Sequence, residues 1–272
     1  MTESKDLFSP DGPNPDPAAD STAEETAPEP PPPPPRPAAP VTGAERIETL
    51  DVLRGFAVLG ILIMNISAYA HVAAAYMNPL ALGQPTMIDW IVWTTNHLLA
   101  DFKFMTLFSV MFGAGVALFA SRLEARGRKP AGLHYRRMFW LWLIGLAHAY
   151  LLWWGDILVS YAVCGCVAYW FRKLRPATLI VIAAIMLILP ALGLLGLGLG
   201  FDHIPAEIQD QMKPEIVSQW SPDQETIDEE LAAYRGNWLE QATKRAPAVF
   251  GAHTGALFFF VGPRVTALML LG

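Results

Sequence analysis

Apolar residues occur along this chain in long runs that are separated by polar stretches. Five runs are long enough to cross a bilayer, which takes about 20 residues, and a sixth run ends the chain. The pattern therefore predicts an all-α, multi-pass transmembrane helical bundle with about six spans. We expect these spans at about Leu53–Ala70, Phe104–Ala120, Met138–Trp154, Ile157–Phe171, Ala177–Leu199 and Val249–Gly272.

The second apolar run, 88–120, is too long for one span. Two spans and a turn need roughly 38 residues, and they would place Asp101 and Lys103 inside the membrane. We therefore expect residues 88–100 to form an interfacial or re-entrant helix that precedes the span at Phe104–Ala120.

Basic residues gather in two of the connections, 122–137 and 172–175. The positive-inside rule predicts that both connections face the cytoplasm. Alternation of the spans then places the N-terminus in the cytoplasm and residues 201–248 outside. Within that outer segment, Ser221 is a candidate N-cap for an acidic helix that continues to Tyr234. This segment is either a lid over the bundle or a solvated connector.

The composition supports a membrane protein, with 53% hydrophobic and only 16% charged residues. Residues 1–44 are rich in proline and carry eight acidic residues against Lys5 and Arg36. We expect this segment to be a disordered cytoplasmic tail, because it has little apolar surface to bury. The tail accounts for the net charge of −6, so the body is close to neutral and nothing favours nucleic acid.

Several polar residues fall inside the apolar runs, where they are costly unless they are paired or functional. Asn65 is eleven residues after Arg54, which places both on nearly the same helix face about 16 Å apart. His148 is eleven residues after Arg137 on the third span, so it should reach about the depth of Asn65.

Asp156 is expected to cap the fourth span, and it could orient His148 if the helices pack suitably. Lys103 would lie near the outer mouth. Each residue also has a structural interpretation: Arg54 as an ion-pair partner of Asp51, and Asn65 and His148 as hydrogen-bonding contacts between helices. Cys164 and Cys166 point to different faces of a helix, so we expect neither a disulfide nor a metal site.

Three ordered motifs resemble the YeiB-like family of bacterial inner-membrane proteins, a family of unknown function. They are LDVLRGFAVLGILIMNISAYAHVAAAYMNP, KFMTLFSVMFGAGVALF and GLAHAYLLWWGDILVSYAVCG. The apolar runs and this resemblance together predict a YeiB-like transmembrane domain over 45–200 with five spans, a periplasmic loop with a helix at 201–248, and a sixth span at 249–272. Family members are longer, and this chain stops within the apolar LMLLG, so we expect a truncated C-terminal half.

The LRG opening of the first span is also similar to heparan-alpha-glucosaminide N-acetyltransferase and to acyltransferase-3 membrane enzymes. This similarity implies transfer of an acyl group from cytoplasmic acyl-coenzyme A, bound only as a substrate, to a glycan or small-molecule acceptor. Arg54, with a weaker contribution from Lys103, would bind the donor. Asn65, His148 and Asp156 are the catalytic candidates. The alternative is a small-solute transporter that uses the same polar residues as a path.

Overall fold

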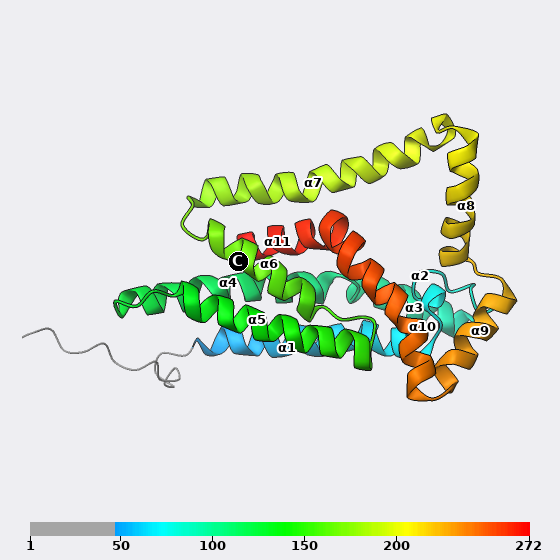
Figure 1. Cartoon of the computed structure of the whole chain (residues 1–272), viewed down its shortest axis with the longest axis horizontal. Helices are drawn as coiled ribbons and strands as arrows, with labels where there is room; N and C mark the ends of the chain where they lie inside the picture. Colours follow the sequence, from blue (N-terminus) through cyan, green and yellow to red (C-terminus); the bar gives the residue numbers. More distant parts are fainter. Residues whose placement is uncertain (1–46) are drawn as a thin grey trace, which may run out of the picture. The chain divides into compact units, whose positions relative to one another are not determined.

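The computed structural model describes residues 47–272, so the tail predicted at 1–44 lies outside the described residues. The described chain is all-α, as predicted, and holds no strand between residues 47 and 272. Its helical segments (Figure 1) are α1 (Glu48–Ala70), α2 (Ala73–Met77), α3 (Met87–Leu99), α4 (Lys103–Ala125), α5 (Ala131–Ala147), η2 (His148–Leu152), α6 (Leu158–Phe171), α7 (Pro176–Gly200), η3 (Phe201–His203), α8 (Ala206–Trp220), α9 (Gln224–Arg235), α10 (Trp238–Gly251), η4 (Ala252–Val261) and α11 (Gly262–Leu271). Segments η2 and η4 are π-helical.

Four helical stretches within residues 47–272 are long and apolar enough to cross a membrane. They are Glu48–Ala70, Met87–Ala125, Pro176–His203 and Trp238–Leu271. The fourth predicted span is present as a shorter apolar helix, Leu158–Phe171. The third predicted span, Met138–Trp154, is not among them. Its helix begins earlier, at Ala131, and gives way to π-helical η2 before Trp153.

The second apolar run divides into two helices where predicted, while the interfacial or re-entrant position of residues 88–100 stays a prediction. Helix α3 ends at Leu99 and α4 begins at Lys103. Phe102, between them, has a φ of 57°, in the left-handed region that non-glycine residues rarely adopt. A residue in this conformation does not continue a right-handed helix, so the two helices are separate elements.

Helix α6 is buried on most of its faces, because it packs against α4, α5 and α11. Tyr161 in this helix is 1% exposed, and its hydroxyl bonds with Ser109 Oγ of α4 at 2.6 Å. Leaving such a buried group unpaired would cost about 1–3 kcal/mol, so the pair favours one register of α6 against α4. Gly113 lets α11 approach α4, since a Cβ there would overlap the Met269 backbone.

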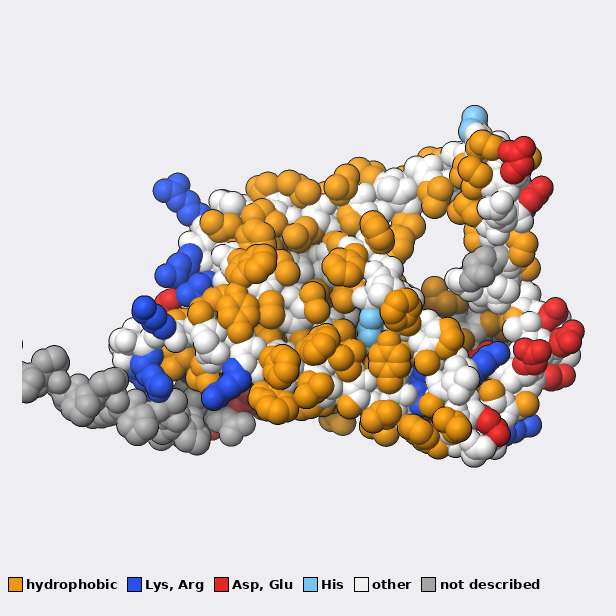
Figure 2. All heavy atoms as spheres, in the orientation of Figure 1, with side chains coloured by type: hydrophobic (Ala, Val, Ile, Leu, Met, Phe, Trp, Pro, Cys, Tyr) orange, Lys and Arg blue, Asp and Glu red, His pale blue; other side chains and the backbone are white. Residues whose placement is uncertain are grey.

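Charged side chains separate into two regions of the described bundle (Figure 2). We call the α4–α5 and α6–α7 connections the basic end, and helices α8 and α9 the acidic end. Hydrophobic side chains cover the helices between them, and α7 is exposed along most of its length except where it packs on α11. An apolar belt between two polar regions is the surface that a bilayer requires.

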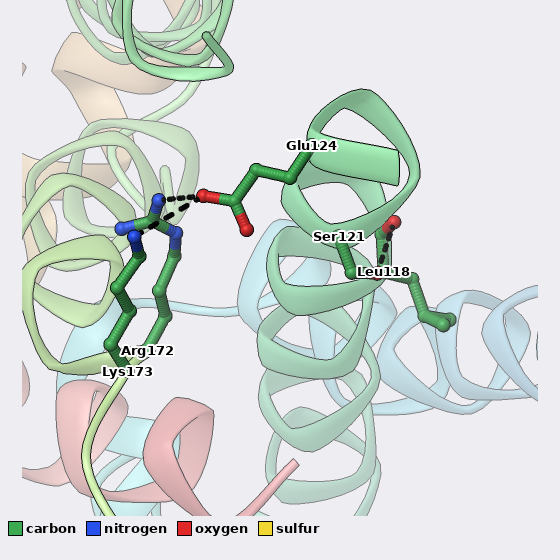
Figure 3. A network of polar contacts seen from close by, with 5 residues as sticks. All are labelled: Leu118, Ser121, Glu124, Arg172 and Lys173. Carbon is green, nitrogen blue, oxygen red and sulfur yellow. Dashed lines mark hydrogen bonds and ion pairs between the residues drawn. The ribbon is translucent and has the colours of Figure 1, made fainter. Parts of the chain in front are cut away.

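An ion-pair network at the basic end joins α4 to the α6–α7 connection (Figure 3). Arg172 donates to a Glu124 carboxylate oxygen at 2.6 Å, and Lys173 Nζ lies 3.6 Å from the same oxygen. Ser121 donates to the Leu118 carbonyl at 3.1 Å within α4. Exposed ion pairs contribute about 0–1 kcal/mol, so the network orients the connection more than it stabilises the fold.

The segment predicted as an outer loop, 201–248, contains three helices, and two of them are fastened to α2 and its flanks. Asn78 Nδ2 donates to the Trp220 carbonyl at the end of α8 at 2.8 Å. The Ala73 N–H donates to Glu230 of α9 at 2.9 Å. These contacts favour a structured cover over a solvated connector.

The acidic helix predicted in this segment is α9, but its predicted N-cap, Ser221, is wrong. Asp223 caps the helix, because its carboxylate accepts the Thr226 N–H at 2.8 Å. A carboxylate at this position also interacts favourably with the positive end of the helix dipole.

Replacing Gly145 with alanine should weaken the packing of α5 on α6. A Cβ at Gly145 would lie 2.7 Å from the Val159 nitrogen, which is backbone and cannot rotate away. Overpacking of this kind costs about 1–3 kcal/mol, so the melting temperature of the detergent-solubilised protein should fall. The control is Gly132→Ala on the same helix, where no atom lies within 4 Å of the new methyl group. A Gly145→Ala melting temperature equal to that of the control would contradict the packing described here.

Acidification should loosen the start of α9 through Asp223. Hydrogen bonds from the Thr226 side chain and backbone hold the pKa of Asp223 below its usual 3.8. Because the folded pKa is lowered, the stabilisation is present above the unfolded value and disappears as pH falls through the folded value. Amide hydrogen exchange in α9, corrected for intrinsic rate, should stay constant down to about pH 4 and accelerate as pH falls further. Asp223→Asn can still cap but does not titrate there, so it should show a smaller change.

Candidate functional site

Two residues of the predicted site meet at the connection between α5 and α6. His148 Nδ1 lies 2.9 Å from one Asp156 carboxylate oxygen, and the other oxygen accepts the Val159 N–H at 2.9 Å. The Asp156 side chain is fully buried, whereas the His148 side chain is 31% exposed. An imidazole held through Nδ1 by a carboxylate keeps Nε2 for another partner. This is the arrangement of an oriented general base.

The backbone positions this pair by leaving the α-helical path. In η2 the Trp153 N–H donates to the His148 carbonyl at 2.9 Å, a bond that spans five residues instead of four. Trp153 is then extended, and the ring lies over Gly155, where a Cβ would overlap it. Single-turn π-helical segments frequently occur at functional sites.

A second histidine, His253 of η4, lies beside η2. Its ring centroid is 6.1 Å from that of Tyr150. Its Nδ1 is buried without a hydrogen-bond partner in residues 47–272. His253 was not among the predicted site residues, although a histidine within an apolar run is the signal that identified His148.

Helix α10 covers the carbonyl groups that η2 leaves unpaired. Arg245, which is 3% exposed, donates to the Tyr150 and Leu151 carbonyls at 3.1 and 3.2 Å. Trp238 Nε1 donates to the Leu151 carbonyl at 2.8 Å. The last carbonyls of a helix have no partner within it, so these two side chains satisfy the end of η2. Neither residue was among those predicted from the sequence.

Asn65 lies on α1, one turn before Tyr69, whose ring stacks on Trp153 with centroids 4.5 Å apart. The Trp153 ring is in turn 6.3 Å from the His148 ring. The structure therefore brings α1 next to the α5–α6 connection. No hydrogen bond joins Asn65 to His148 in the described chain.

Lys103 is part of a separate polar cluster where α2, α3 and α4 meet. Its Nζ donates to the His97 carbonyl at 2.9 Å, and the His97 ring stacks on Trp93. The Tyr76 hydroxyl donates to Asp101 at 2.8 Å. Burial, followed by the hydrogen bond to Asp101 and the charge of Asp101, raises the pKa of Tyr76 above its usual 10, so the phenol stays protonated.

Arg54 lies at the basic end, away from Lys103. It lines a cavity of about 760 Å³ between α1, α4 and the start of α5. Its Nη2 donates to the Met111 carbonyl at 3.2 Å, and its Nη1 is 3.5 Å from Asp51, the expected ion-pair partner. The sequence candidates therefore do not form one cluster. His148 and Asp156 lie beneath α10, whereas Arg54 borders a cavity at the other side of the bundle.

These elements define a multi-pass helical membrane protein that holds ionisable side chains within its bundle. The chain is related to the YeiB-like proteins, as its sequence resemblance predicted. It is similar to the uncharacterized protein YeiB of Escherichia coli (strain K12), at 35% identity over 230 residues, which is 84% of this chain and 55% of that protein. It is also similar to the uncharacterized protein YxaH of Bacillus subtilis (strain 168), at 37% identity over 155 residues, which is 55% of this chain and 38% of that protein.

The chain thus spans about half, or less, of the length of these curated relatives. No family model matches the chain, and no solved structure matches it. Within residues 47–272, no group of three or more His, Cys, Asp and Glu side chains could hold a metal ion.

Removing the Arg245 side chain should loosen the turn that carries His148. Arg245→Met keeps much of the apolar stem but leaves the Tyr150 carbonyl without this donor, at a cost of about 1–3 kcal/mol. The melting temperature should fall, and hydrogen exchange should increase in η2. Arg235→Met, at an exposed position on α9, is the matched control and should change neither. Equal exchange in η2 for both variants would show that Arg245 does not hold this turn.

Proposed function

We propose that this protein is a membrane-bound acyltransferase of the bacterial inner membrane, with its N-terminus and basic end in the cytoplasm. The donor is acyl-coenzyme A, and the acceptor is a hydroxyl or amine of an envelope glycan or small molecule that arrives from the acidic end. The observation that carries the proposal is the 2.9 Å contact between His148 Nδ1 and the fully buried Asp156 carboxylate.

The reaction requires one base near the acyl carbonyl. His148 Nε2 accepts the proton of the acceptor hydroxyl or amine as that atom attacks the thioester carbonyl carbon. The new bond to the acyl carbon forms, the carbon–sulfur bond breaks, and His148 returns the proton to the departing thiolate. Asp156 keeps Nδ1 protonated and stabilises the imidazolium during the transfer.

Asn65 would polarise the thioester carbonyl from α1. An amide N–H aimed at developing negative charge is most effective where water is scarce, as it is inside a membrane bundle. The contact of Tyr69 with Trp153 supports this role, because it brings the neighbouring turn of α1 to the connection that carries His148. The role requires Asn65 to approach the carbonyl when the donor is bound.

The donor must be long enough to connect the two sides of the bundle. Arg137 lines the basic cavity, and His148 follows eleven residues later along α5 and η2, a rise of about 16 Å. An elongated thioester whose phosphates stay at the basic end could reach His148 with its acyl group. This spacing favours a coenzyme A donor over a compact acyl donor.

His148→Ala and Asp156→Asn should each reduce acyl transfer by the purified protein in nanodiscs. General-base catalysis contributes about 10²–10⁴-fold, so a loss in that range is expected for His148→Ala, with KM for the donor little changed. Product formation from radiolabelled acetyl-coenzyme A and a panel of amino sugars and polyols is the measurement.

His203→Ala is the matched control, because it removes a histidine of η3 that lies outside this site. The control should retain full activity. Transfer that is unaffected in folded His148→Ala protein would overturn the proposed mechanism. Gradient-driven solute uptake into proteoliposomes without any covalent product would instead favour the transporter alternative.

A further inference from the structure

The cavity at the basic end has the chemistry of an anion site. Its walls carry Arg54 on α1, Arg122 and Arg126 at the end of α4, and Arg137 on α5. Among the described residues that line it, Asp51 is the only acid, so arginines predominate on the described walls. Charges of one sign along a low-dielectric cleft concentrate the opposite charge within it.

Arg54 is positioned by its packing on α4. Its guanidinium lies against Gly115, where a Cβ would collide with Nη2, and it donates to the Met111 carbonyl at 3.2 Å. The contact with Asp51 is loose, at 3.5 Å between side chains that are both about one-third exposed. Exposed pairs of this kind are weak, so this contact positions Arg54 less firmly than its packing on α4 does.

Arg137 faces the cavity from a different helix. Its guanidinium carbon lies 4.5 Å from the centroid of the Phe119 ring, a cation–π arrangement. Stacking occupies the flat face of a guanidinium but not the N–H groups along its edge, which match phosphate oxygens in pairs. Arg137 therefore keeps the edge of its guanidinium for a phosphate, and Arg54, which donates one N–H to Met111, has further N–H groups on the same cavity.

The remaining walls are apolar, and they limit the kind of anion that would fill the space. Phe108, Phe112, Val116, Leu118 and Met138 line the cavity beneath the arginines. His134 also lines it, but that side chain is 1% exposed, bonded to the Gly165 carbonyl and stacked on Tyr169. A small inorganic anion would leave these apolar walls uncovered.

We infer that this cavity is a binding site for a phosphate ester attached to an apolar or extended chain, with Arg54 and Arg137 as its phosphate ligands. Two molecules at the inner face of a membrane have this chemistry: a coenzyme A thioester and an anionic phospholipid. The coenzyme A alternative rests on the proposed function. The phosphate site itself does not, because it requires no acyl transfer.

The test measures binding by the intact protein in phosphatidylcholine nanodiscs. Isothermal titration with coenzyme A and with adenosine 3′,5′-bisphosphate forms one arm. The other arm compares thermal stability in phosphatidylcholine nanodiscs with that in nanodiscs that contain phosphatidylglycerol. The double variant Arg54→Gln/Arg137→Gln should give a clear loss in at least one arm. Either its affinity for the coenzyme A ligands falls at least tenfold, or phosphatidylglycerol no longer shifts its melting temperature. Higher salt should weaken the same binding.

Arg136→Gln is the matched control, because Arg136 is adjacent in sequence and exposed but does not line the cavity. It should bind like the wild type, and Arg54→Lys, which keeps the charge but loses the fork, should have intermediate affinity. His148→Ala should retain binding while losing transfer, which separates this site from the proposed mechanism. No response in either arm, or equal binding by the double variant and the control, would overturn the inference.

Discussion

The constraint on which the described bundle depends is that polar backbone groups removed from water need partners. Between α5 and α6 the chain abandons the α-helix, and the freed groups are satisfied by side chains from elsewhere in the sequence. Arg245 and Trp238 bond the carbonyls at the end of η2, while Asp156 accepts the Val159 N–H. Irregular backbone within a membrane protein is tolerated only where it is satisfied in this way. The same contacts that permit the irregular connection also fix the carboxylate next to His148.

Close helix packing makes this arrangement possible. Gly145 and Gly113 remove side chains where α5 meets α6 and where α4 meets α11. In lipid there is little hydrophobic drive for helices to associate, so small residues and specific hydrogen bonds have to provide the contact. The pair formed by Ser109 and Tyr161 supplies such a bond near the centre of the bundle. Packing and polar pairing thus act together on the same helix, α6.

Hydropathy and local signals were sufficient for most of the fold. They predicted the all-α class, the division between α3 and α4, and the acidic helix α9, because each depends on residues close together in sequence. The N-cap error has a local cause too, since Ser221 and Asp223 are both good caps and only the geometry selects Asp223. The predicted start of the third span differs from the helix, which begins at Ala131, because it continues toward the basic end past Arg137 and Arg136, whose long side chains can reach water.

The site was less predictable, because its members come from segments far apart along the chain. Sequence spacing identified His148 and Asp156 as candidates but did not predict the hydrogen bond between their side chains. It gave no sign that α10 and η4 would bring Arg245 and His253 to the same connection. The length of the π-helical turn η2 also matters when related sequences are compared. Each residue advances a helix by about 100°. A relative that lacks one residue of η2 could therefore keep both the histidine and the aspartate in its sequence, while the histidine side chain points away from the aspartate. A conserved-looking histidine in an alignment therefore does not guarantee the His148–Asp156 pair, and the length of this turn has to match as well.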